Sequence, residues 1–542
     1  MKKNILLAAA MIAASCNILA QRDSLNAVIS VENDYTPVVT KATKRAFTPS
    51  TEENDATRPL DLEYSRNATP FRGFTSERDV KDLLPGQKKS SPGYARLGYG
   101  TGNNTDAVIS YEQNISDNGK LRTIASHRGY NTKIDGIAGK WDSRMFSSWV
   151  NADYTHRFNG FTLGLNGEFG NNVFNYQKAL ATDKQNNKRY KIAMEGTSLL
   201  SGPVNFTFNV GYSRSQYGYL LNSPDNFSEN KFNIGALVKY EITDNLLHDI
   251  NLGVDLNNYI YRGMDGAKNF LSADFNPYAT ILGDNYRMKI GANINIATSF
   301  GSRMAIAPDF EIETTGYENF TMYGSIKGGR QANSIERLEQ LSPYWFGFGQ
   351  LKPSYTIADI TAGIRIAREA LSFNFYLGYS YTKDDLLSAA YYDEVIDKYG
   401  DPIRGGIYSL MALENTGRVY VGTSVGYDYE GWLKASLAAR YNRWKCSDKY
   451  LIGTKPEAEI EFNIEARIIE NLYTSLAYNF ATYSYDAPSK NKNEVNLRAT
   501  YKLSDNFGAF VEGNNLLNQE YVKYAGYYEQ GINVLLGVSA TF

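Results

Sequence analysis

The sequence predicts an all-β chain that closes into a transmembrane antiparallel β-barrel of about 22 strands, with short periplasmic turns and longer extracellular loops. Three observations predict this fold. Apolar and polar residues alternate in many segments, the connections between these segments alternate in length, and the composition is polar on average yet rich in aromatic residues and glycine. The 542 residues include 42 Tyr, 26 Phe and 46 Gly at a mean hydropathy of −0.41. The polar lumen and the lipid-facing side of barrel strands average to such a composition.

Alternation is clearest in the stretch EAEIEFNIEARI at residues 457–468. Period two places all apolar side chains on one face of a strand and all polar side chains on the other. We expect the apolar face to meet lipid and the polar face to line a hydrated lumen. A lumenal charge row, balanced by basic residues of neighbouring strands such as Arg440, is a simpler interpretation of the polar face than paired catalytic carboxylates. The row consists of Glu457, Glu459, Glu461, Glu465 and Arg467.

Further strands and their connections follow the same pattern. Clear alternation recurs at residues 288–296, 304–313, 371–381, 494–501 and 531–542. Short turns are predicted at residues 159–160, 283–285, 430–431 and 503–506, and long loops at residues 177–187, 332–350, 384–408, 446–455 and 517–529. A soluble β-sandwich or propeller is the alternative, but it would need a cover over each apolar face. Open sheet edges do not occur in hydrocarbon, so strands in a membrane must close into a barrel.

The first 91 residues differ from the rest of the chain. Residues 1–20 have two lysines, an apolar run and small residues, which predicts a signal peptide cleaved between Ala20 and Gln21. Cys16 leaves a lipoprotein signal as the rival interpretation, although the usual leucine three positions before the cysteine is missing. Residues 21–91 contain four Thr-Pro or Arg-Pro pairs and no sustained periodicity, which predicts an extended periplasmic or lumenal segment. The barrel is expected to occupy residues 92–542.

The C-terminal segment EGNNLLNQEYVKYAGYYEQGINVLLGVSATF resembles the end of TonB-dependent outer-membrane receptors. The resemblance rests on Asn515, Leu516, Leu517, Asn518, Tyr521, Gly531, Gly537 and Phe542. It implies a 22-strand barrel in the cell outer membrane, passage or uptake of solutes, a TonB-type periplasmic partner, and Phe542 as the insertion signal. The chain departs from the family because residues 21–91 are too short for its folded plug. Only Val28–Val31 could serve as a degenerate TonB-contacting segment.

No motif for chemistry stands out. His127, His156 and His248 are far apart and lack metal-ligand spacing, and neither a nucleophile elbow nor a phosphate-binding loop occurs. We therefore expect no enzyme activity and no cofactor. The net charge of −2 gives no indication of a nucleic-acid partner. After the signal peptide only Cys446 remains, so no disulfide framework is expected.

The loop at residues 332–350 is the remaining candidate site, since it predicts a short helix followed by an aromatic cluster. The candidate ligand contacts are Arg337, Tyr344, Trp345 and Phe346 in this loop, together with Arg330 just before it. They could bind a sugar, a peptide or a lipid, or they could form an aromatic girdle with a folded-in loop, which we prefer. The predicted function is passage or uptake of solutes. The alternative is a non-transporting outer-membrane scaffold that docks surface or periplasmic proteins. A surface lipoprotein is a candidate partner, and the outer-membrane lipid is a partner in both cases.

Overall fold

The computed structural model describes residues 92–137, 139–177, 185–198, 202–217, 227–242, 247–263, 267–300, 303–314, 319–346, 352–396, 402–429, 432–483 and 491–542. The predictions made for residues 1–91 therefore lie outside the described residues. They concern the signal peptide with its cleavage between Ala20 and Gln21, Cys16, and residues 28–31. Within the described ranges, none of the helices is long and apolar enough to cross a membrane.

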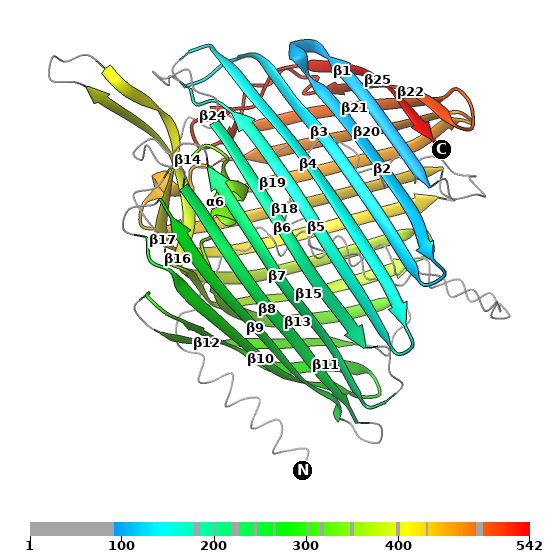
Figure 1. Cartoon of the computed structure of the whole chain (residues 1–542), viewed down its shortest axis with the longest axis vertical. Coiled ribbons are helices and arrows are strands. Elements are labelled where there is room, and N and C mark those ends of the chain that lie inside the picture. The colour runs from blue at the N-terminus through cyan, green and yellow to red at the C-terminus, as the bar shows by residue number, and fades with distance from the viewer. Residues whose placement is uncertain are drawn as a thin grey trace.

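One closed antiparallel sheet forms the wall of the barrel (Figure 1). Its first half comprises β1 (Gly93–Gly100), β2 (Thr105–Ser116), β3 (Gly119–Ile134), β4 (Trp141–Phe158), β5 (Phe161–Phe174), β6 (Gln185–Ser198), β7 (Val204–Tyr217), β8 (Phe227–Glu241), β9 (Leu247–Arg262), β10 (Phe270–Leu282) and β11 (Tyr286–Ala297). Its second half comprises β12 (Met304–Thr314), β13 (Phe320–Gln331), β15 (Ser354–Arg368), β16 (Leu371–Ile396), β17 (Pro402–Tyr429), β18 (Leu433–Cys446), β19 (Ala458–Ile469), β20 (Leu472–Thr482), β21 (Lys492–Lys502), β22 (Phe507–Asn514) and β25 (Asn533–Thr541).

The first and last strands pair with each other and close the barrel. Ala95 lies opposite Ala540 and Leu97 opposite Val538, while β25 pairs with β22 on its other edge. The sheet contains 23 strands, of which 22 form the wall and one, the two-residue β14 (Trp345–Phe346), pairs with β17 inside the mouth. The predicted class and strand number are therefore confirmed.

Short turns gather at one rim of the barrel and long connections at the other. Residues 159–160 join β4 to β5 and residues 470–471 join β19 to β20, whereas residues 332–353 and 515–532 form long connections at the opposite rim. We call the rim with the long connections the extracellular end and the other rim the periplasmic end, following the prediction from the sequence. The predicted long loop at residues 384–408 is wrong, because most of these residues extend β16 and β17 into a long hairpin whose strands pair with each other.

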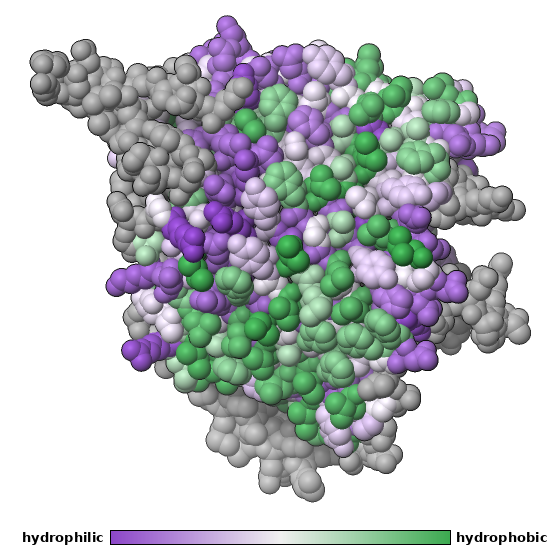
Figure 2. Space-filling model, in the orientation of Figure 1, coloured by the Kyte–Doolittle hydropathy of each residue, from purple (hydrophilic) through white to green (hydrophobic). Residues whose placement is uncertain are grey.

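The two faces of the wall follow the predicted alternation. On β21, Leu497 is 42% exposed on the outside, whereas the neighbouring Asn496 and Arg498 are 2% exposed on the inside. Figure 2 shows apolar side chains gathered over the outer wall, most densely in the lower half of the view. Exposed residues of the strands on this side include Ile192, Ile234, Leu252 and Ile290.

Tyrosine and glycine form reciprocal pairs on the inner side of the wall. Tyr376 lies opposite Gly422, and Tyr420 lies opposite Gly378. Each ring covers the glycine of the neighbouring strand so closely that a Cβ atom added to Gly378 would lie 2.3 Å from the Tyr420 ring. Glycine is required here because of this close approach. These pairs explain part of the high content of both residue types.

Candidate functional site: the lumen and the extracellular mouth

The hairpin of β16 and β17 leaves the wall near the extracellular rim. β15 pairs with β16 only as far as Lys383, and β18 pairs with β17 only from Thr416 onward. Beyond these points the two strands pair with each other, after a register shift between Thr382 and Asp385. Asp384, within this shift, has φ of 53°, a left-handed conformation that a non-glycine residue rarely adopts. We call residues 384–392 and 406–415 the lid hairpin.

A second segment folds into the mouth beside the lid hairpin. It contains α6 (Ile335–Leu341), the short helix that the sequence predicts, and β14. The Ser334 hydroxyl caps the helix by accepting from the Arg337 amide at 3.4 Å, and Glu336 occupies the first turn, where a negative charge is favourable. β14 runs parallel to β17, and the Ser409 amide donates to the Tyr344 carbonyl at 2.9 Å. This pairing joins α6 and β14 to the lid hairpin.

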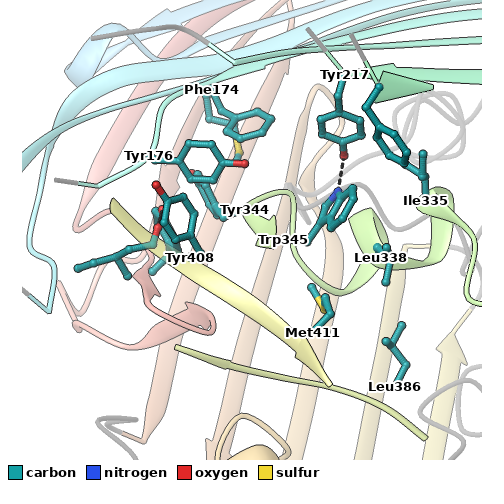
Figure 3. Close-up of a cluster of buried hydrophobic side chains, with 14 of the residues drawn as sticks. Phe174, Tyr176, Tyr217, Ile335, Leu338, Tyr344, Trp345, Leu386, Tyr408 and Met411 are labelled. Atoms are coloured by element: carbon teal, nitrogen blue, oxygen red, sulfur yellow. Dashed lines mark hydrogen bonds between the residues drawn. The ribbon is translucent and has the colours of Figure 1, made fainter. Parts of the chain in front are cut away.

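A cluster of buried aromatic and aliphatic side chains packs across the mouth (Figure 3). We call it the mouth cluster, and it consists of Tyr130, Ile134, Met145, Phe174, Tyr176, Tyr217, Phe227, Ile335, Leu338, Tyr344, Trp345, Leu386, Ile407, Tyr408, Met411 and Tyr527. These residues come from β3, β4, β5 and the connection after it, from β7 and β8, from α6, β14 and the residue before β14, from the lid hairpin, and from the connection that holds β24 (Tyr527–Tyr528). Ten wall strands separate β5 from β17 in either direction around the barrel, so the cluster joins opposite sides of the barrel.

A chain of polar contacts fastens α6 and β14 to the wall. The Trp345 indole Nε1 donates to the Tyr217 hydroxyl at 2.7 Å, and that hydroxyl donates to the Glu339 carboxylate. Arg189 of β6 pairs with Glu339 at 2.6 Å and with Glu336 at 3.3 Å. Burial raises the pKa of the Glu339 carboxyl despite the opposing effect of Arg189. The contacts hold α6 against β6 and β7.

Ser409 of the lid hairpin is the point where three segments meet. Its hydroxyl lies 2.7 Å from the Ser342 hydroxyl at the end of α6, and it also donates to the Ala525 carbonyl at 2.7 Å. Ala525 lies between β23 (Val522–Tyr524) and β24. The rings of Tyr344 and Tyr527 stack there with centroids 3.5 Å apart. Burial raises the pKa of both phenols.

A further segment, the connection after β5, also touches the lid hairpin. The Ile407 amide donates to the Gln177 carbonyl at 2.9 Å, and the Gln177 amide donates to the Tyr527 hydroxyl at 3.2 Å. The Tyr527 hydroxyl in turn donates to the Ile407 carbonyl. The edge of β17 that faces away from β16 therefore has two partners in succession, Gln177 at Ile407 and β14 from Ser409 onward.

The predicted ligand contacts of the loop at residues 332–350 occupy different environments. Tyr344 and Trp345 are 2% and 1% exposed within the mouth cluster, so they present no surface to a ligand while the mouth is packed. The Arg337 guanidinium donates to the Asn333 side chain at 2.6 Å and to the Ser354 hydroxyl at 3.1 Å. The Arg330 guanidinium donates to the Arg303 carbonyl. The backbone of Phe346 belongs to β14, and its side chain lies outside the described part of the structure.

The predicted lumenal charge row is distributed along β19. Glu459 forms an ion pair with Arg440 of β18, the arginine that the sequence suggested as a balance. Glu461 and Glu465 occupy alternate positions of the same strand, and Glu465 lies opposite Lys434. Glu457 precedes β19 and accepts from the Tyr441 hydroxyl at 3.2 Å. Arg467 lies opposite Tyr473, next to a register shift.

A row of amides and carboxylates on β7 to β11 was not identified from the sequence. Asn209, Gly235, Asp255, Asp274 and Asn295 lie opposite one another on successive strands. The Asn295 amide donates to Asp274 at 2.5 Å, and the Asn209 and Asp255 side chains are exposed. The sequence does place Asn or Asp at alternating positions of these strands, but only the register shows that they form one lateral row.

A neighbouring row continues this polar surface toward β12. The Asn276 side chain donates to Asn293 at 2.7 Å and to Asp309 at 2.8 Å, while Lys289 pairs with Asp309 at 2.6 Å. Such a wall offers hydrogen-bond donors and acceptors to water or to a polar solute. No group of three or more His, Cys, Asp or Glu residues suited to a metal ion occurs within the described ranges.

Comparison with known proteins gives similarity at the level of the fold. No family model and no curated protein matches the chain. Among solved structures, the copper transporter OprC is 14% identical with a TM-score of 0.60, covering 84% of this chain and 80% of OprC. The siderophore receptor PirA from Acinetobacter baumannii is 12% identical with a TM-score of 0.63, covering 84% and 81%. The iron transporter FrpB from Neisseria meningitidis is 11% identical with a TM-score of 0.64, covering 85% and 83%. The chain therefore has the barrel fold of TonB-dependent outer-membrane receptors, as its C-terminal segment suggested.

Proposed function

We propose that the chain resides in the cell outer membrane and passes or takes up solutes through its lumen. The observation that carries this proposal is the polar inner wall of β7 to β12, with its amide and carboxylate rows. A solute that leaves bulk water inside the barrel exchanges its hydration for these groups, which lowers the cost of entry. The similar structures of OprC, PirA and FrpB are a copper transporter, a siderophore receptor and an iron transporter, which supports transport as the class of function.

We propose that residues 21–91 regulate this passage. They precede Pro92, whose carbonyl accepts from the Glu112 amide at 2.7 Å next to the first wall strand. Barrels of 16–18 strands already leave an aqueous channel, so a barrel of this size needs a filling. The segment can reach the lumen from the periplasmic rim, or it can contact a periplasmic protein of the TonB type. The ligand contacts proposed for Arg330, Arg337, Tyr344, Trp345 and Phe346 would require a rearranged mouth.

Flux of small polar solutes into proteoliposomes tests the proposal. The full chain is compared with a variant that lacks residues 24–88 behind an intact signal peptide, which removes no wall strand. We expect the shortened chain to assemble as a heat-modifiable barrel and to pass solutes faster than the full chain. Equal flux through both chains would place residues 21–91 outside the lumen. Flux through neither chain would argue against transport.

The packed mouth favours a second candidate, a scaffold that docks periplasmic proteins or a surface lipoprotein without transport. The mouth cluster joins opposite walls, which is the arrangement expected of a barrel that transmits no solute. The two candidates differ in the flux measurement. Site-specific cross-linking from the exposed Tyr392 and Tyr450 in intact cells would identify a surface partner, and a stoichiometric cross-link without any flux would favour the scaffold.

A further inference from the structure

We infer that the lid hairpin, together with α6, β14 and the β23–β24 connection, is a hinged gate at the extracellular mouth, closed in this structure. The inference rests on the proposed passage of solutes and concerns its regulation. Two properties support it: the lid hairpin has left the ladders of the wall, and it has a defined point about which to turn.

The detachment from the wall follows from the pairing of the strands. Between Asp385 and Ile396, β16 pairs only with β17, and β15 makes no ladder with it there. The β18 ladder likewise ends at Thr416, opposite Cys446. Because no wall ladder crosses these points, the hairpin can move as a unit while all 22 wall strands keep their neighbours. Segments that move in this way usually turn about a few residues at the ends of elements.

The turning point lies at Asp384 and Asn415, where the hairpin meets the wall. Asp384 has the positive φ noted above, and its backbone amide donates to the Asn415 side-chain oxygen at 3.1 Å. Its carboxylate pairs with Lys352 at 2.6 Å, in the segment that leads from β14 to β15. Strained conformations of this kind persist where the surrounding structure fixes them, and they cluster at switch regions.

The closed position depends on the junction at Ser409. Ser342 of the α6 segment and Ala525 of the β23–β24 connection both contact the Ser409 hydroxyl. Opening requires that this junction and the stacked pair of Tyr344 and Tyr527 separate together. Both partners reach Ser409 from long loops rather than from wall strands, so their separation from it breaks no wall ladder.

The junction allows a reversible lock. The hydroxyl oxygens of Ser342 and Ser409 are 2.7 Å apart, so cysteines at these two positions would bring their sulfur atoms close to the S–S bond length of about 2.05 Å. We propose the variant Ser342→Cys with Ser409→Cys in a Cys446→Ser background, since Cys446 is the only free cysteine in the described part of the chain. The two single-cysteine variants in the same background are the matched controls. Heat-modifiable migration and a free-thiol assay establish that each variant is folded and that the lock forms.

Flux into proteoliposomes is measured before and after addition of a reductant, in the full chain and in the chain that lacks residues 24–88. We expect the oxidised double variant to lose most of its flux, the reductant to restore it, and the single-cysteine controls to be unaffected. If only the shortened chain responds in this way, the gate is still supported, and the remaining block in the full chain belongs to residues 21–91. Equal flux in the locked and released forms would overturn the gate and leave the proposed passage intact. Absence of flux from every form, including the released shortened chain, would overturn both.

Discussion

Replacing Trp345 by alanine is expected to loosen the mouth without unfolding the barrel. The indole is 1% exposed, donates to Tyr217 at 2.7 Å, and contacts the Tyr217 and Phe227 rings edge-on at centroid distances of 5.4 and 6.2 Å. Truncation of a buried tryptophan to alanine costs about 3–5 kcal/mol, which includes about 1 kcal/mol for the lost hydrogen bond. Since Trp345 belongs to no wall strand, this cost falls on the closure of the mouth.

Hydrogen exchange measures this effect residue by residue. At about 1.4 kcal/mol per factor of ten, the population of the opened mouth should rise by roughly two to three and a half powers of ten. We expect faster exchange at the Ser409 and Ile407 amides, which donate to the Tyr344 and Gln177 carbonyls, and unchanged exchange in β20 and β21. Trp432→Ala is the matched control, because Trp432 is 41% exposed and lies beside a short turn. Equal loss of protection in the wall strands would refute the separation of lid and wall, and no change at Ser409 would refute the burial of Trp345.

Three further predictions address the wall, the charge at the mouth and the glycine–tyrosine pairs. Ile464→Arg should impair assembly, because an arginine on the lipid-facing side costs about 2–4 kcal/mol near the midplane. Glu465→Gln, on the lumenal side, should assemble normally. Equal yields of heat-modifiable protein from the two variants would contradict the assignment of faces. Burial raises the pKa of the Glu339 carboxyl, so the closed mouth binds the carboxyl proton more tightly than the opened mouth does. The free energy of closure should therefore become more favourable as the pH falls from neutral toward the ordinary glutamate pKa of about 4.3. Exchange at Ser409, corrected for the intrinsic rate, should show this trend, and Glu339→Gln should abolish it; the opposite trend would mean that the ion pair with Arg189 dominates. Gly378→Ala should destabilise the barrel by about 1–3 kcal/mol, because the new methyl group lies 2.3 Å from Tyr420 and 2.5 Å from the Ile360 carbonyl. Gly253→Ala is the control, since its methyl group meets nothing closer than 3.5 Å. Equal heat-modifiability temperatures for the two variants would argue against the close packing at Gly378.

The amino-acid sequence by itself determined the wall of this protein. Alternation of period two is a local property, so stretches such as residues 457–468 and 494–501 reveal which side chains meet lipid and which meet the lumen without knowledge of their neighbours. The helix at the start of residues 332–350 was also predictable, since Ser334 and Glu336 form a local N-terminal signal.

Only the tertiary structure decided the mouth. The sequence predicts a loop at residues 384–408, whereas the structure has two strands that pair only with each other there. Several of their side chains are buried against aromatic residues that lie far away in the chain. From the sequence, Tyr344 and Trp345 could be exposed ligand contacts or part of a folded-in loop. Their burial depends on contacts with Tyr217 and Tyr527, which lie more than a hundred residues before and after them in the chain. The lateral row from Asn209 to Asn295 depends in the same way on the register of five strands. Contacts between distant segments leave no periodic trace in the sequence, because each partner keeps only its own local pattern and the pairing is set by the closure of the whole barrel.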